Sequence, residues 1–113
     1  MIRSDIIRGN IDTIILKLLQ EKDMYGYEIV NEIKNRTDNM FNIKEATLYS
    51  VVQRLEKREL IDSYMGEKSH GRKRRYYIIT SFGKAYYKEL ISEYKTLKDI
   101  MIKILGDDVI WII

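Results

Sequence analysis

The sequence contains no cysteine and no proline, and it has a single histidine. Without cysteine the chain forms no disulfide framework and no thiolate metal cage, and one histidine without partner ligands gives no metal site. The longest apolar run, from Val109 to Ile113, is too short to cross a bilayer. The first ten residues lack the apolar stretch and cleavage site of a secretory signal, so we expect them to belong to the mature fold. These absences predict a cytoplasmic protein with no cofactor, no metal and no membrane partner.

The chain has 113 residues, which suits one small domain rather than two lobes around a large cleft. It carries no Ser/His/Asp set, metal cluster or phosphate-cradling glycine loop, so we do not expect an enzyme. Its charge is uneven, because residues 34–84 hold 12 Lys and Arg against 6 Asp and Glu, whereas the rest hold 8 against 11. A concentrated cationic segment attracts polyanions such as nucleic acid, although charge alone is explained equally well by a solvated surface.

Three amphipathic helices are predicted in the first half of the chain. The first spans residues 9–21, the second starts after Asp23 as its cap, and the third spans residues 44–57. Asn42 and Glu45 are predicted to form a capping box at the start of the third helix. The residues predicted to face inward are Ile11, Ile14, Ile15, Leu18 and Leu19, then Ile29, Val30 and Ile33, then Leu48, Val51, Val52 and Leu55.

After Glu59 the apolar period changes from about 3.6 to about 2, which indicates β-strands. Residues 60–65 and 74–80 are rich in Ile and Tyr, and the polar segment 66–73 between them suits the tip of a hairpin. Packed against three helices, such a hairpin becomes a wing. Most basic runs are simply solvated, but one on a hairpin arm after three helices favours nucleic-acid binding. The consecutive cations here are Arg72, Lys73, Arg74 and Arg75.

The last predicted helix spans residues 81–105, or roughly 38 Å at about 1.5 Å per residue. Apolar residues along it alternate in steps of three and four, as in the seam of a coiled coil. We predict a homodimer in which this helix and the first helix pair across a two-fold axis. The alternative is that the stripe packs back on the chain's own first helix. The predicted interface residues are Ile7, Ile11, Leu90, Tyr94, Leu97, Met101 and Ile104.

These elements predict a mainly α fold with a small β-hairpin. A winged helix-turn-helix domain is expected at residues 1–80, and a C-terminal dimerisation helix and tail at residues 81–113.

Three segments together resemble a known family. They are RGNIDTIILKLLQEKDMYGYEIVNEI (residues 8–33), EATLYSVVQRLEKRELI (residues 45–61) and GRKRRYYIITSFGK (residues 71–84). Their MYGY, TLY…RLEK and YY-x-[IL]-T-x-x-G motifs are similar to those of the PadR family of bacterial winged helix-turn-helix transcriptional regulators. The single long carboxy-terminal helix is similar to the short-form branch, which includes multidrug sensors. Glu59 stands where the family usually has a helix-ending glycine, and Ile78 where a basic residue is common.

The major groove of B-DNA admits one α-helix, and the third helix is the candidate for it. Its predicted contact residues are Lys44, Ala46, Thr47, Ser50 and Arg54, of which Lys44 and Arg54 would hold phosphates. For Gln53 and Lys57 the sequence leaves open whether they contact DNA or are plain helix surface. Tyr49 is assigned first to the core, with the alternative that its hydroxyl reaches a phosphate. Tyr25 and Gly26 would offer a phosphate the free amides at the start of the second helix. The wing would reach the flanking minor groove with His70, Gly71, Arg72, Lys73 and Arg74.

The resemblance also implies an effector site. In drug-sensing relatives an aromatic residue of the last helix lines a cavity at the dimer interface, and the matching residue here is Tyr94, with Asp12 and Lys98 nearby. A small apolar or cationic ligand would stack on paired tyrosines, and Asp12 would supply the opposite charge. The alternative is that Tyr94 only packs the dimer seam.

The resulting hypothesis is a homodimeric repressor that binds an inverted-repeat operator in double-stranded DNA and is released by a small-molecule effector. The alternative is a protein-binding winged-helix adaptor without sequence-specific DNA binding. Specific DNA binding that weakens steeply with salt distinguishes the first from the second.

Overall fold

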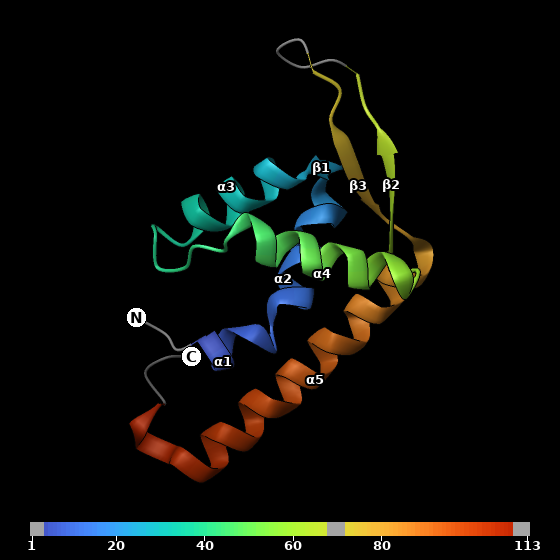
Figure 1. Cartoon of the computed structure of the whole chain (residues 1–113). Coiled ribbons are helices and arrows are strands. Elements are labelled where there is room, and N and C mark those ends of the chain that lie inside the picture. Colours follow the sequence, from blue (N-terminus) through green and yellow to red (C-terminus); the bar gives the residue numbers. More distant parts are fainter. Residues whose placement is uncertain (1–3, 68–71, 110–113) are drawn as a thin grey trace.

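The structure, a computed structural model, describes residues 4–67 and 72–109 (Figure 1). The elements are α1 Ser4–Arg8, α2 Ile11–Glu21, β1 Met24–Tyr25, α3 Gly26–Arg36, α4 Glu45–Lys57, β2 Ile61–Met65, β3 Arg75–Ile79, α5 Ser81–Leu105 and a short 3-10 turn, Gly106–Asp108. The predicted mainly helical winged-helix fold, with a small sheet and a long last helix, is confirmed.

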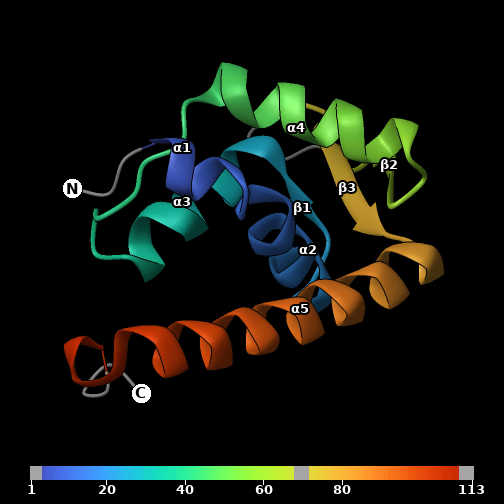
Figure 2. The ribbon, with the colours of Figure 1, turned by 90° about the horizontal axis from the view of Figure 1, so that it is seen from below.

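Helices α2, α3 and α4 share one apolar core. All four residues predicted to face inward from α4 are buried, and so are four of the five in α2 and two of the three in α3. Ile14 and Val30 are the exceptions, and they lie partly buried against the same core. Figure 2 shows α2 lying between α4 and α5, and α2 contacts both of these helices.

The predicted start of α2 is two residues too early. The helix begins at Ile11 rather than at Gly9, because the short helix α1 precedes it. The side-chain amide of Asn10 donates a hydrogen bond to the Ile6 carbonyl oxygen (3.1 Å) in the turn between the two helices.

The capping box predicted for α4 is wrong. The N-cap of this helix is Lys44, and no side chain in the described part of the chain caps it. Ile43, the residue before the cap, is buried in the core. Because Ile43 holds the chain there, Asn42 lies two residues before the position from which it would cap the helix.

The sheet has three antiparallel strands in the order β1-β3-β2. The hairpin of β2 and β3 confirms the prediction, with Ile61 opposite Ile79. The third strand, β1, was not predicted, and its two residues pair with Tyr77 and Tyr76. Because β1 is extended, α3 begins only at Gly26, and Asp23 is therefore not its cap, contrary to the prediction.

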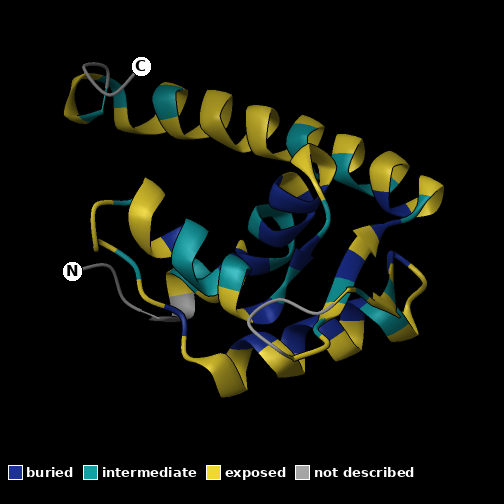
Figure 3. Ribbon diagram, turned by 90° about the horizontal axis from the view of Figure 1, so that it is seen from above, coloured by how far each residue is buried: buried dark blue, intermediate teal, exposed yellow. Residues whose placement is uncertain are grey.

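Helix α5 begins at Ser81 and ends at Leu105, as predicted. The Thr80 hydroxyl caps it by accepting a hydrogen bond from the Gly83 amide (2.9 Å). Its first half packs against the core, whereas residues 92–101 are all exposed (Figure 3). The radius of gyration is 15.9 Å, compared with about 13 Å for a compact chain of this length. The second half of α5 therefore extends away from the body formed by the other elements.

Candidate nucleic-acid interface

Helix α4 presents an exposed crest on the side opposite its buried stripe. The residues of this crest follow one another at steps of four, three and four, which places them on one line along the helix. All are exposed, and the first two have small side chains that allow a close approach to another surface. The crest consists of Ala46, Ser50, Gln53 and Lys57. Of the other predicted contacts, Lys44 precedes the first turn, and Thr47 lies beside the crest on the flank toward α2.

On that flank Arg54 is engaged by a carboxylate. Its guanidinium donates two hydrogen bonds to Asp12 of α2, at 2.8 and 2.7 Å. The bonded carboxylate raises the pKa of Arg54 above its usual value. The structure thus pairs two residues that the sequence assigned to different sites, Arg54 to a DNA phosphate and Asp12 to an effector.

The opposite flank of α4 borders a polar groove of about 740 Å³ that separates this helix from β3 and the start of α3. The groove brings together residues predicted for the wing and for the second helix, namely Lys73, Arg74, Tyr25 and Gly26. Its full lining is Tyr25, Gly26, Tyr27, Glu45, Tyr49, Gln53, Glu56, Lys73, Arg74, Arg75 and Tyr77. Two separate parts of the predicted interface therefore form one surface.

Tyr49 belongs to this groove rather than to the core, which corrects the prediction. Its side chain is 43% exposed, and its hydroxyl lies 2.8 Å from the place that a Cβ on Gly26 would occupy. A side chain at position 26 would therefore require the phenol of Tyr49 to move. Tyr49 follows the buried Leu48 by one residue, so the helical period alone placed it at the edge of the core.

A ladder of three tyrosines covers the outer side of the sheet at the base of the wing. The rings of Tyr64 and Tyr76 are stacked with centroids 5.7 Å apart, and Tyr25 meets Tyr76 edge to face at 5.5 Å. The Arg74 guanidinium lies 5.1 Å from the centre of the Tyr25 ring. Its Nε atom is buried and has no hydrogen-bond partner within residues 4–67 and 72–109. The ladder therefore fixes Arg74 beside the groove with an unused donor.

Arg75 is held differently from its neighbours. It donates a hydrogen bond to the Ser63 hydroxyl (3.1 Å), which in turn donates to Glu56 (2.8 Å). Arg72 and Lys73 are exposed. The predicted wing residues His70 and Gly71 lie outside the described residues.

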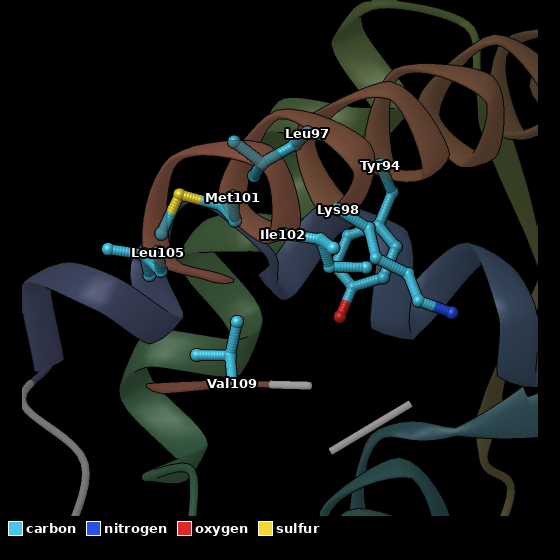
Figure 4. Close-up of a pocket in the computed structure, with 7 residues that line it drawn as sticks. All are labelled: Tyr94, Leu97, Lys98, Met101, Ile102, Leu105 and Val109. Atoms are coloured by element: carbon cyan, nitrogen blue, oxygen red, sulfur yellow. The ribbon is translucent and has the colours of Figure 1, made fainter. Parts of the chain in front are cut away.

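Helix α5 carries a second hollow, of about 350 Å³, near its carboxy-terminal end (Figure 4). Tyr94 and Lys98, both predicted for an effector site, line it together. Asp12, the third predicted residue, is not among the lining residues and instead forms the ion pair with Arg54. The lining comprises Tyr94, Leu97, Lys98, Met101, Ile102, Leu105 and Val109.

The described residues contain neither a membrane-spanning helix nor a metal-binding cluster. Residues 4–67 and 72–109 include no helix with the length and apolar character that a membrane span requires. The same residues hold no cluster of three His, Cys, Asp or Glu side chains suited to a metal ion.

The arrangement of an exposed helix crest, a basic wing and a groove between them agrees with the comparison to known families. Residues 15–89 match the family model described as "Transcriptional regulator PadR-like family". The chain belongs to the PadR family. It is thus a PadR-family transcriptional regulator with a DNA-binding winged helix, and it is not an enzyme.

Similar proteins agree with this assignment. A transcriptional regulator from Clostridium thermocellum is 50% identical, with a TM-score of 0.83, over 91% of this chain and 97% of that one. A PadR family transcription regulator from Clostridium difficile is 37% identical, with a TM-score of 0.74, over 87% of this chain and 100% of the other. A protein of Lysinibacillus sphaericus described as "Uncharacterized protein X" is 62% identical over 89% of this PadR-family chain and 93% of that protein.

Proposed function

We propose that this PadR-family regulator is a homodimeric repressor that reads an inverted-repeat operator with α4 and its basic wing. The observation that carries the proposal is the groove in which the wing cations Lys73 and Arg74 meet α4 and the start of α3. An exposed helix with wing cations along one flank matches a major groove bordered by phosphates.

In this proposal the amino-terminal part of α4 reads base edges. Thr47 and Ser50 have hydroxyls that donate to or accept from bases, Ala46 meets a thymine methyl, and Lys44 binds a phosphate. Gln53 joins them because it lies on the crest and also lines the groove. Arg54 is the exception, because its guanidinium binds Asp12.

Phosphates of the same half-site would lie along the groove. The guanidinium of Arg74, beside the groove, and the backbone amides of the first turn of α3 are donors suited to a phosphate oxygen. The amide of Tyr25 is not among them, because it donates a hydrogen bond to Glu28 (3.2 Å). Arg72 and Lys73, with the predicted tip residues His70 and Gly71, would continue into the flanking minor groove.

Dimerisation would use the exposed apolar part of α5. Tyr94, Leu97, Met101 and Ile104 are all at least 45% exposed, although they follow a coiled-coil spacing. Of the other predicted interface residues, Ile11 is buried within the chain itself, and Ile7 and Leu90 are half-buried. A two-fold dimer would present two α4 helices about 34 Å apart, one turn of DNA, and so read an inverted repeat.

An effector would bind where the two α5 helices meet. Tyr94 and Lys98 line one hollow of mainly apolar character, which suits a small planar apolar ligand. A cationic ligand would need the charge of Asp12, which Arg54 already neutralises. Because Tyr94 also lies on the proposed dimer stripe, the effect of Tyr94→Ala is measured at a protein concentration where sedimentation equilibrium shows the variant to be a dimer. At that concentration the variant should bind the operator, and such a ligand should no longer release it.

The DNA-reading proposal is tested by comparing two variants. Footprinting upstream of the protein's own gene supplies the operator, and binding to it is measured beside binding to a random duplex. Thr47→Ala with Ser50→Ala should reduce operator preference more than total affinity, whereas Arg74→Ala should weaken binding to both duplexes alike. Equal losses on both duplexes for the first pair would refute the assigned reading residues, and no binding to any duplex would refute the repressor.

A further inference from the structure

Asp12 joins three helices through two arginines, Arg54 in α4 and Arg58 at the C-cap of the same helix. It accepts both hydrogen bonds from Arg54, and its carboxylate lies 3.8 Å from the guanidinium of Arg58. The Arg58 guanidinium in turn lies 4.9 Å from the centre of the Tyr86 ring in α5. These contacts form a cluster in which α2 supplies the anion, α4 and its C-cap residue supply the two cations, and α5 supplies the aromatic ring.

The geometry of the Arg54 pair is that of a strong ion pair. Two parallel N–H···O bonds of 2.7–2.8 Å match the fork of a guanidinium to a carboxylate. The Asp12 side chain is 19% exposed, so it is shielded from water more than the Arg54 side chain, which is 49% exposed. Asp12 also lies in the first turn of α2, where the helix dipole favours a negative charge.

This pair changes the electrostatics of the interface. Arg54 follows Gln53 of the crest by one residue, close enough to the proposed reading surface for a free guanidinium to bind a phosphate. A phosphate would have to displace a carboxylate that already satisfies both arms of the guanidinium. A cation that stays neutralised releases no counterion from DNA and adds nothing to affinity for random sequence.

We propose that Asp12 is a positioning residue for DNA binding. It holds Arg54 to anchor α4 against α2 and withholds this cation from phosphates, which lowers affinity for DNA of any sequence. The inference rests on the proposed DNA-reading function of α4. Lower non-specific affinity favours a regulator, because the genome offers a large excess of random sites.

The test is the salt dependence of binding to a random-sequence duplex, measured for the full chain over a series of KCl concentrations. Asp12→Asn frees Arg54 and should steepen the slope of log K against log[salt] by about 0.9 for each protomer that gains one phosphate contact. Arg54→Ala alone should leave the slope of the unchanged protein as it is. The double variant Asp12→Asn with Arg54→Ala should return to that slope.

Asp99→Asn is the matched control, because it removes the same charge from an exposed position on α5 and should leave the slope unchanged. A slope that falls by about 0.9 in Arg54→Ala would overturn the inference, since Arg54 would then bind a phosphate in spite of Asp12. An Asp12→Asn protein that folds with an unchanged slope would overturn it too, and if that variant does not fold, the Arg54→Ala slope decides. Absence of duplex binding by the unchanged protein would instead refute the proposed function itself.

Discussion

The three-helix body and the second half of α5 have the same kind of apolar pattern but different surroundings. In α2, α3 and α4 every predicted stripe residue except Ile14 and Val30 is at most 8% exposed, whereas in α5 Leu97 is 52% and Ile104 is 77% exposed. Both patterns arise from apolar residues spaced at three and four. The spacing therefore predicts which side of a helix is apolar, and the rest of the chain decides whether that side is covered.

The difference has an energetic consequence. Burying a side chain such as leucine is worth about 1.5–3 kcal/mol, and the body gains this within one chain. The exposed part of α5 gains it only from another surface. A closed two-fold dimer places the same patch of each subunit against its copy, so both copies of each exposed residue would be covered.

The largest expected effect comes from placing a charge on that exposed stripe. Leu97→Asp removes one apolar side chain from each protomer, which should weaken dimerisation by about 3–6 kcal/mol, or roughly a hundredfold or more in dissociation constant. Sedimentation equilibrium should show monomers at micromolar concentrations. Because a monomer contacts one half-site only, operator affinity should fall with it.

Thr96→Asp is the control for this substitution, because Thr96 is the adjacent residue and lies outside the apolar stripe. It should leave both the oligomeric state and the operator affinity unchanged. A Leu97→Asp protein that remains a dimer would show that the exposed apolar stripe of α5 is not the dimer interface.

The next largest effect is expected where the start of α5 contacts the three-helix body. A Cβ on Gly83, in the first turn of α5, would overlap the carbonyl oxygen of Leu60 at the end of the body. Because backbone must move to make room, Gly83→Ala should destabilise the fold by about 1–3 kcal/mol in chemical denaturation. Gly9→Ala is the control, since a Cβ there meets nothing within 4 Å. Equal stability of the two variants would contradict the close approach of Gly83 to the Leu60 carbonyl oxygen.

Local pattern was sufficient to predict the long elements. Helix α5 was predicted at both ends, because its apolar stripe is long. Strand β1 was missed because two residues are too few to show a period of two. It exists only through pairing with β3, some 50 residues later in the chain. The wrong cap at Asp23 follows from the same omission.

The candidate site was predictable where it depends on helix geometry alone. The exposed crest of α4 is the complement of its buried stripe, so Ala46 and Ser50 were found from the sequence. The ion pair of Asp12 and Arg54 was not, because it joins residues 42 positions apart. No local spacing indicates such a contact, and the sequence assigned its two members to separate functions.

A smaller effect is expected at the end of α4, inside the body. Glu59 has a φ of 62°, and its amide donates to Glu56 O while the next amide, of Leu60, donates to Leu55 O. These bonds form the Schellman motif, in which glycine is preferred at the position of Glu59. Glu59→Gly should therefore stabilise the protein by about 1 kcal/mol in chemical denaturation. Glu59→Ala still places a Cβ in the left-handed conformation, so it should not increase the stability of the protein in this way.

The smallest effect should come from a surface contact of the body. Arg36 of α3 binds Glu21 at the end of α2, and this hydrogen bond holds the pKa of Glu21 below its usual value. A carboxyl whose pKa is lowered by folding adds stability above its unfolded pKa, near 4.5, and loses it as the pH falls through the folded value.

Glu21→Gln should therefore lower the Tm slightly at pH 7, and this difference from the unchanged protein should shrink below about pH 4.5 and vanish at lower pH. The effect should be small because exposed ion pairs are screened by water, whereas the core beneath them is not. Thermal melts of both proteins at pH 7, 5, 4 and 3 measure it, with Glu93→Gln on the exposed part of α5 as the control. A Tm difference as large as that of Gly83→Ala would mean that surface charge supports the body as much as its packing does.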